Sequence, residues 1–140
     1  MPLDLARSPA EQRAAAQVAI DDLAGDVRRQ YLTTVPGQSD TYREKLADCQ
    51  NYLSQLLRSA LTGTKNHPWV AAEAEAQNMA PRAAAEHVVA TYEQWRAVGI
   101  QIEKARIAGK RAVREAPDSG IAKARAQALA QLRALMPASG

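Results

Sequence analysis

The chain has 140 residues and a net charge of +3, a size that fits a single domain. Alanine is the commonest of its apolar residues, phenylalanine is absent and aromatic residues make up only 4%, so we expect a thin core and closely spaced helices. One cysteine, Cys49, excludes an internal disulfide, and we expect it to be a small core residue in a reducing compartment. The sequence shows neither a secretory signal nor an apolar window of transmembrane length, so we expect no membrane insertion and a cytosolic location.

Charge is distributed unevenly along the chain. Residues 101–140 carry eight lysines or arginines against three acidic residues, whereas residues 1–100 carry ten against twelve. The basic end is either a solvated helix face or an attractor for nucleic acid, an anionic membrane surface or an acidic protein. The lack of interleaved aromatic residues and of a reading motif argues against nucleic acid.

Prolines and capping residues divide the first half of the chain into two long helices. Ser8-Pro9-Ala10-Glu11 has the form of a capping box and predicts a helix from residue 9 to about 33. Turn-forming residues at 35–40 predict a reversal before the second helix. The second helix has apolar residues at alternating steps of four and three, as in the seam of paired helices: Tyr42, Leu46, Cys49, Leu53, Leu56 and Ala60.

The second half of the chain contains the longest predicted element. Pro68 begins a short helix that ends near residue 78, and a long helix follows from Pro81 to Ala116. At about 1.5 Å per residue the long helix spans roughly 50 Å, more than a compact domain of this size needs. Its apolar side changes near Gly99 from large residues to small ones, so we expect its first half to join a bundle and its second half to leave it.

A last helix is predicted from Ile121 to Met136, after a turn at residues 117–120. It either folds back on the second half of the long helix or pairs with the same helix of another subunit. The elements together predict an all-α fold, an antiparallel bundle of three long helices with a short fourth and a C-terminal helix, in which the long helix 81–116 extends from the bundle. We expect a single helical domain over residues 1–140, with the bundle at 8–116 and the C-terminal helix and tail at 117–140.

The residues that could carry chemistry form no recognisable set. His67, His87 and Cys49 have no partner at the spacing that metal ligands use, so we expect no metal site and place His67 in a loop. No serine lies near a histidine or lysine that could activate it. We therefore expect no catalytic residues, no cofactor, no small-molecule substrate and no enzymatic activity.

The spacing on the long helix and the C-terminal helix suggests an interface instead. Three basic residues recur at four-residue steps and form a flank that would meet an acidic surface: Arg106, Lys110 and Arg114. The residues that we expect at the interface with a partner or a second copy share the apolar side of these helices: Trp95, Val98, Ile102, Ala105, Gly109 and Leu132.

A series of short motifs begins with Arg28-Arg29-Gln30-Tyr31-Leu32-Thr33 and continues through Pro36-Gly37-Gln38, Thr41-Tyr42, Lys45 and Tyr52. In order and spacing these motifs resemble a helical domain common in tail and tail-fibre accessory proteins of tailed phages and prophages. The resemblance covers roughly residues 13–116, and its later part includes Pro68 to Ala74 and Tyr92 to Arg111. It implies a turn between two helices, in which Tyr42 covers the turn and Lys45 lies on the surface. The residues of this family-like turn are Gly37, Gln38, Thr41, Tyr42 and Lys45.

The resemblance implies a virion or tail-assembly accessory role through protein–protein contacts rather than catalysis. Other phage structural or assembly proteins would be the partners, with self-association into a homo-oligomer, in the cytoplasm of the bacterial host during assembly and in the virion. One alternative is a phage-encoded protein that binds or regulates a host component. Another is a nucleic-acid-binding helical protein, which would show salt-dependent DNA affinity.

Overall fold

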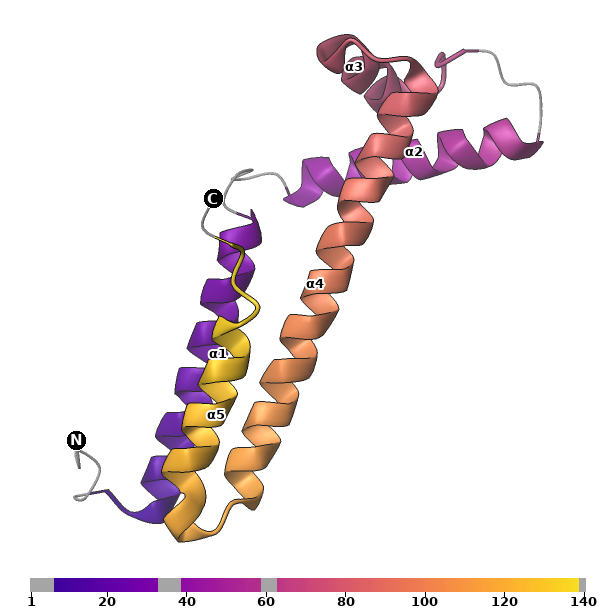
Figure 1. Ribbon diagram of the computed structural model, residues 1–140. Helices are drawn as coiled ribbons and strands as arrows, with labels where there is room; N and C mark the ends of the chain where they lie inside the picture. Colours follow the sequence, from indigo (N-terminus) through magenta and orange to yellow (C-terminus); the bar gives the residue numbers. More distant parts are fainter. Residues whose placement is uncertain (1–6, 33–38, 59–62, 139–140) are drawn as a thin grey trace. The chain divides into compact units, whose positions relative to one another are not determined.

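The computed structural model describes residues 7–32, 39–58 and 63–138 of the chain. Within these residues all regular structure is helical: α1 (Pro9–Leu32), α2 (Ser39–Arg58), α3 (Pro68–Gln77), α4 (Pro81–Glu115) and α5 (Ile121–Arg133), with a 3₁₀ turn at Asp118–Gly120 before α5 (Figure 1). The all-α prediction is confirmed, and the long helix ends one residue before the predicted Ala116. The last helix ends earlier than predicted, because the residues after Arg133 tighten into i→i+3 hydrogen bonds.

Local sequence signals explain where α1 begins. The Ser8 hydroxyl accepts a hydrogen bond from the Glu11 amide at 3.1 Å, and the Glu11 carboxylate accepts one from the Ser8 amide at 3.2 Å. This reciprocal pair is the capping box that the sequence predicts, and it satisfies two amides that the first turn leaves without helical partners. Hydrogen bonds from Ser8 lower the pKa of Glu11.

The described helices divide into two compact units, and the division falls within α4 between Arg96 and Ala97. Unit 1 contains α1, α4 from Ala97 onward and α5. Unit 2 contains α2, α3 and α4 up to Arg96. The expected change of character near Gly99 therefore has a structural counterpart. The sequence led us to expect α1 in one bundle with α2 and the first half of the long helix. In the structure the core residues of α1 pack with the second half of α4 and with α5.

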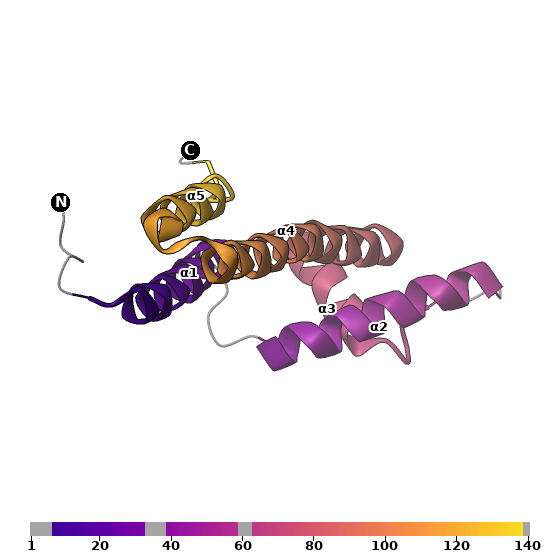
Figure 2. The same cartoon turned by 90° about the horizontal axis from the view of Figure 1, so that it is seen from below.

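Unit 1 is a three-helix arrangement in which α1 and α5 both lie along α4 (Figures 1 and 2). Gly109 allows the close approach of α5, because a Cβ atom at that position would lie 2.7 Å from the Cβ of Ala128. Of the two arrangements that the sequence left open for the last helix, the structure shows the fold-back on the long helix. The buried core of this unit consists of Ala16, Ile20, Ala24, Val27, Ile102, Val113, Ile121, Ala128, Leu129 and Leu132.

Polar contacts from α1 also hold the end of α4 in unit 1. Arg13 donates to the carbonyl of Ala116 at 2.7 Å and to the carboxylate of Asp118 at 2.9 Å. Gln17 donates to the carbonyl of Lys110 at 2.9 Å. Side chains of α1 therefore bond a carbonyl group in the last turns of α4 and another just beyond its end, where helix geometry leaves acceptors unpaired.

Unit 2 has its own core, built on the seam that the sequence predicts for α2. Cys49 is fully buried there, as expected, and burial raises the pKa of its thiol to about 11. The buried residues of this core are Cys49, Tyr52, Val70, Ala85 and Val88, and the partly buried residues packed against it are Leu46, Leu53, Leu56 and Val89.

Candidate functional site

The residues predicted to form a partner interface are divided between the two units. Ile102, Gly109 and Leu132 are buried inside unit 1, and Val98 and Ala105 pack half-buried against the same core. Trp95 lies in unit 2, where its ring stacks on Tyr42 with centroids 5.1 Å apart. Most of these side chains hold the chain's own helices together, because their apolar side is the one that packs on α1 and α5. The folded chain does not offer the buried Ile102, Gly109 and Leu132 as a surface.

The predicted basic flank meets acidic residues of the chain itself. Arg106 donates to Asp21 on α1 and to Glu103, with each pair of atoms 2.9 Å apart, and Lys110 donates to Asp21 at 2.8 Å. Hydrogen bonds from Lys110 and Arg106 lower the pKa of the Asp21 carboxyl group. Two of the three predicted cations thus have an acidic surface within unit 1, and only Arg114 is exposed among them.

Glu103 joins the same cluster from the other side. Arg106 lowers the pKa of Glu103 to about 2 through its hydrogen bond and charge, and Arg28 adds to the effect from α1. Arg28 and Glu103 form an ion pair at 2.6 Å. Nearby, Tyr31 donates a hydrogen bond to the carbonyl of Leu135 at 2.6 Å. Arg28 and Tyr31 therefore help to hold α1 to the other helices of unit 1.

Another set of cations in unit 1 remains available to a partner. These side chains are exposed and form no ion pair with any acidic residue in the described part of the chain: Lys104 and Arg114 on α4, and Lys123, Arg125 and Arg133 on α5 or at its end. The positive charge that the sequence places at the C-terminal end thus collects on the outer surfaces of two helices. Arg106 and Lys110 differ from these cations because both pair with Asp21, which lies 85 and 89 residues before them in the chain. Spacing along one helix could not reveal this difference.

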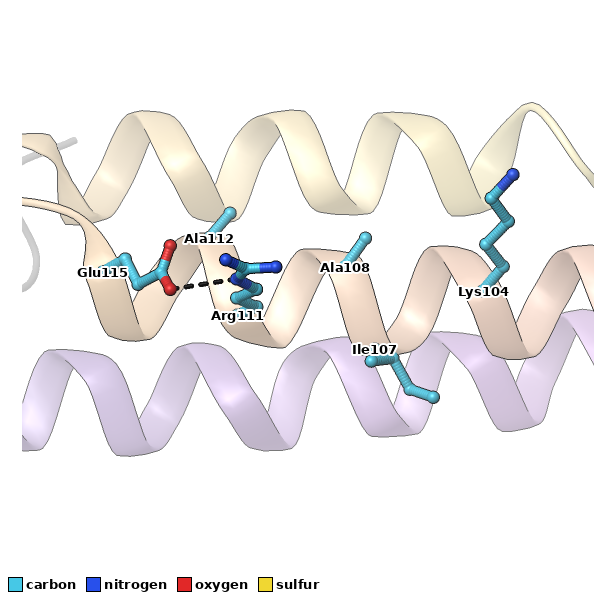
Figure 3. A pocket seen from close by; sticks show the side chains of 6 residues that line it. All are labelled: Lys104, Ile107, Ala108, Arg111, Ala112 and Glu115. Atoms are coloured by element: carbon cyan, nitrogen blue, oxygen red, sulfur yellow. Dashed lines mark hydrogen bonds and ion pairs between the residues drawn. The ribbon is translucent and has the colours of Figure 1, made fainter.

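The outward side of α4 in unit 1 carries exposed apolar residues that the sequence prediction missed. Ile100 and Ile107 are 51% and 53% exposed, and their seven-residue spacing places them on one side of the helix. A hollow of about 460 Å³ opens beside Ile107 (Figure 3). Arg111 crosses it to donate to Glu115 at 2.9 Å. The sequence signal that could have identified Ile100 and Ile107 is their position off the main apolar side of the helix.

The family-like turn lies in unit 2, and part of it falls outside the described residues, namely Gly37 and Gln38. Thr41 is exposed, and the Tyr42 hydroxyl donates to the carbonyl of Val88 at 3.4 Å. Lys45 was expected on the surface, but its side chain is largely buried. Its ammonium group pairs at 2.6 Å with Glu73 on α3, whose side chain is also largely buried.

These residues border a small hollow of unit 2. It measures about 190 Å³ and is lined by Tyr42, Lys45, Glu73, His87, Val88, Thr91 and Trp95. Its size is below the roughly 300 Å³ at which small-molecule pockets usually begin. Tyr42 and Trp95 therefore serve mainly to pack α2 against α4.

A buried histidine is the main polar feature of unit 2 that sequence reasoning did not predict. His67, expected in a loop, is only 3% exposed, and its Nδ1 and Nε2 atoms each lie 3.0 Å from an oxygen, of Asp48 and Gln55 respectively. The second carboxylate oxygen of Asp48 accepts hydrogen bonds from the amides of Trp69 and Val70 at 2.9 and 3.1 Å. A carboxylate at a helix N-terminus satisfies free amides and favours the helix dipole.

A histidine paired with an aspartate, as His67 is with Asp48, serves acid–base chemistry in many enzymes, but in this chain the pair has a structural role. Both ring nitrogens of His67 are occupied, and the edge of the ring meets the Tyr52 ring at a centroid distance of 5.3 Å. A general base must reach the proton that it removes, and this ring has no exposed nitrogen. Asp48 and His67 therefore anchor the start of α3 to α2.

The described residues contain no cluster of three or more histidine, cysteine or acidic side chains able to hold a metal ion. None of the described helices combines the length and the hydropathy that crossing a membrane requires. Comparisons with protein-family models, with curated proteins and with solved structures found no match to this chain.

Proposed function

We propose that this chain is a non-enzymatic accessory protein of a tailed phage or prophage that acts through protein–protein contacts during virion or tail assembly. The observation that carries the proposal is the outward side of α4 in unit 1, where Ile100 and Ile107 are exposed and the unpaired Lys104 lies between them in the sequence. Exposed apolar residues gathered on one side of a helix are typical of interaction surfaces. The resemblance of residues 13–116 to phage tail-associated domains suggests which class of partner uses that surface.

Unit 2 has an exposed apolar site of its own. Leu57 is 86% exposed and borders a hollow of about 170 Å³ that Leu53, Leu56, Arg82 and Glu86 also line. Each unit therefore offers a surface for a partner, and α4 supplies residues to the cores of both units as one continuous helix. Two separate surfaces suit an adaptor that joins components of an assembly, and the partners would be other phage structural proteins in the cytoplasm of the bacterial host.

The proposal is tested in the phage or lysogen that encodes the chain. A tagged copy replaces the natural one, and purified virions, tails and assembly intermediates are analysed by quantitative mass spectrometry. We expect the chain at a fixed number of copies per particle or per intermediate. Its absence from all three fractions, together with recovery on a host enzyme, would support the alternative of a phage-encoded regulatory protein and overturn the assembly role.

Variants show whether the outward side of α4 is responsible. Ile100→Glu and Ile107→Glu should lower the copy number several-fold without changing the helix content of the purified chain, because both side chains are half exposed. Val18→Glu is the matched control, since Val18 is a 58% exposed apolar residue on α1 of the same unit. Equal loss in all three variants would contradict a role for this side of α4.

A further inference from the structure

Three hollows on unit 1 follow one another along α4 and share lining residues, and α4 alone lines the first, whereas α5 and the residues after it also line the second and third. The first, of about 460 Å³, shares Lys104 and Ala108 with the second, of about 240 Å³. The second shares Gln101 and Leu135 with the third, of about 320 Å³. In Figure 3 Lys104, Ala108 and Ala112 point toward α5, while Ile107 lies on the side of α1. We call this feature the α4–α5 groove.

The dimensions of the α4–α5 groove fit a helix. It follows α4 from Ala97 to Glu115, which at about 1.5 Å per residue corresponds to roughly 27 Å, or five turns of helix. Its far end is lined by larger apolar side chains that unit 1 leaves partly uncovered: Tyr31, Val98, Leu135 and Met136. A helix laid there would pack against α4 along its length and, beside the second hollow, against α5 as well.

Charge favours one kind of occupant. Lys104 borders two of the three hollows and Arg111 borders the first, while Glu115 is the single acidic residue along the groove. Lys123 and Arg125 on α5 add exposed positive charge to the same unit. Since complementary charge favours binding and like charge opposes it, a second copy of this basic unit is a poor occupant and an acidic segment is a good one.

We infer that the α4–α5 groove binds one amphipathic helix of a partner protein, apolar on the side that enters the groove and acidic along its two flanks. This inference names the chemistry of the partner and rests on the proposed protein–protein role. Leucine-sized side chains of the partner would fill the hollows along α4. Its carboxylates would pair with Lys104.

The full chain is tested with three fluorescent peptides of about 18 residues, each held helical by a side-chain staple. The first has leucine at the a and d positions of its heptads and glutamate at the flanking e and g positions. The second has lysine in place of every glutamate, and the third keeps the glutamates but has serine in place of every leucine. We expect saturable binding of the first peptide by fluorescence anisotropy, and binding at least about tenfold weaker for each of the others.

Variants of the chain locate the site. Ala108→Tyr fills the groove at an exposed position and should weaken binding of the first peptide by about tenfold or more, whereas Ala14→Tyr, on an exposed part of α1 away from the hollows, should not. Lys104→Glu should weaken it by about fivefold and raise the affinity for the lysine peptide. Lys65→Glu changes net charge equally at an exposed site in unit 2 and is its control.

Three results would overturn the inference. One is equal affinity for the glutamate and lysine peptides. Another is a dimer in sedimentation equilibrium that Ala108→Tyr dissociates, because a second copy would then occupy the groove. The third is tighter binding of a duplex DNA oligonucleotide that the same variants abolish. Presence of the chain in virions together with any of these results would leave the assembly role standing and remove only the acidic-helix partner.

Discussion

Two glycines of α4 provide a direct test of how closely the helices of unit 1 pack. A Cβ atom on Gly109 would meet the Ala128 Cβ at 2.7 Å and the Ile20 Cδ1 at 3.6 Å, whereas a Cβ atom on Gly99 would meet nothing within 4 Å. Both positions lie inside one helix, so the intrinsic gain in helix propensity on replacement by alanine is the same, about 1 kcal/mol. The substitutions Gly99→Ala and Gly109→Ala therefore differ only in the contact that the new methyl group makes.

The expected free energies of unfolding follow from these contacts. Gly99→Ala should stabilise the chain by about 1 kcal/mol. At Gly109 the added methyl group meets a side chain that cannot rotate away, because Ala128 has only its Cβ, so α5 must shift. Overpacking of this kind costs about 1–3 kcal/mol, which cancels the propensity gain or exceeds it by up to about 2 kcal/mol. The two variants should thus differ by about 1–3 kcal/mol.

Equilibrium unfolding in urea measures the difference, followed by far-UV circular dichroism for all helices and by tryptophan fluorescence for unit 2, which holds both Trp69 and Trp95. The double variant Gly109→Ala with Ala128→Gly moves the methyl group from one helix to the other. It should recover stability relative to the sum of its single variants, with a coupling of about 1–3 kcal/mol. If Gly109→Ala proved as stabilising as Gly99→Ala, the close approach of α4 and α5 would be wrong.

Three further predictions concern individual side chains. Asp48→Asn removes the charge that caps α3 and should lower the free energy of unfolding by about 1–2 kcal/mol in urea melts, while Asp40→Asn, at an exposed carboxylate, should change it by less than about 0.5 kcal/mol. Because Arg106 lowers the pKa of Glu103 to about 2 from 4.5, the stabilisation from this carboxylate is complete above pH 4.5 and is lost as pH falls toward 2. Urea melts of Glu103→Gln should therefore show a smaller loss of stability between pH 5 and pH 2.5 than the natural chain, and an equal loss would contradict the ion cluster. Cys49 should resist a thiol reagent at pH 8 in the folded chain and react rapidly in denaturant, because it is fully buried and its thiol pKa is raised to about 11; fast reaction without denaturant would refute its burial.

The helices were largely predictable because their signals are local. Ser8 and Glu11 are three residues apart and bond to each other, and Pro9, Pro68 and Pro81 each begin a helix where the sequence predicts one. The seam of α2 was predictable for the same reason, since the apolar spacing of one helix determines which side it buries.

The partners of each helix were less predictable. Nothing in the spacing of α1 indicates whether its apolar side meets α2 or α5, because alanine and leucine side chains fit either neighbour. The acidic partner of the basic flank within the chain could not be predicted from spacing either. Arg106 and Lys110 lie at the expected steps, but Asp21 neutralises both of them from another helix.

The candidate surface depends on what is left after the chain has packed on itself. Gly109 and Ile102 were expected at an interface with a partner, and the fold uses them inside unit 1. Ile100 and Ile107 were passed over in the sequence because they lie off the main apolar side, which is why they remain exposed. A predicted apolar stripe is first evidence of an internal core, and the residues beside it are the better candidates for a partner.

For this protein, the sequence alone determined the all-α class, where the helices begin and the change of character within the long helix near Gly99. These properties depend on capping, proline positions and periodicity, which act over a few residues. Only the tertiary structure decided that α1 and α5 share α4 from Ala97 onward, that Asp48 and His67 anchor α3, and which cations stay free beside the α4–α5 groove. Those outcomes depend on contacts between residues far apart in the chain, whose pairing is selected by the packing of whole helices.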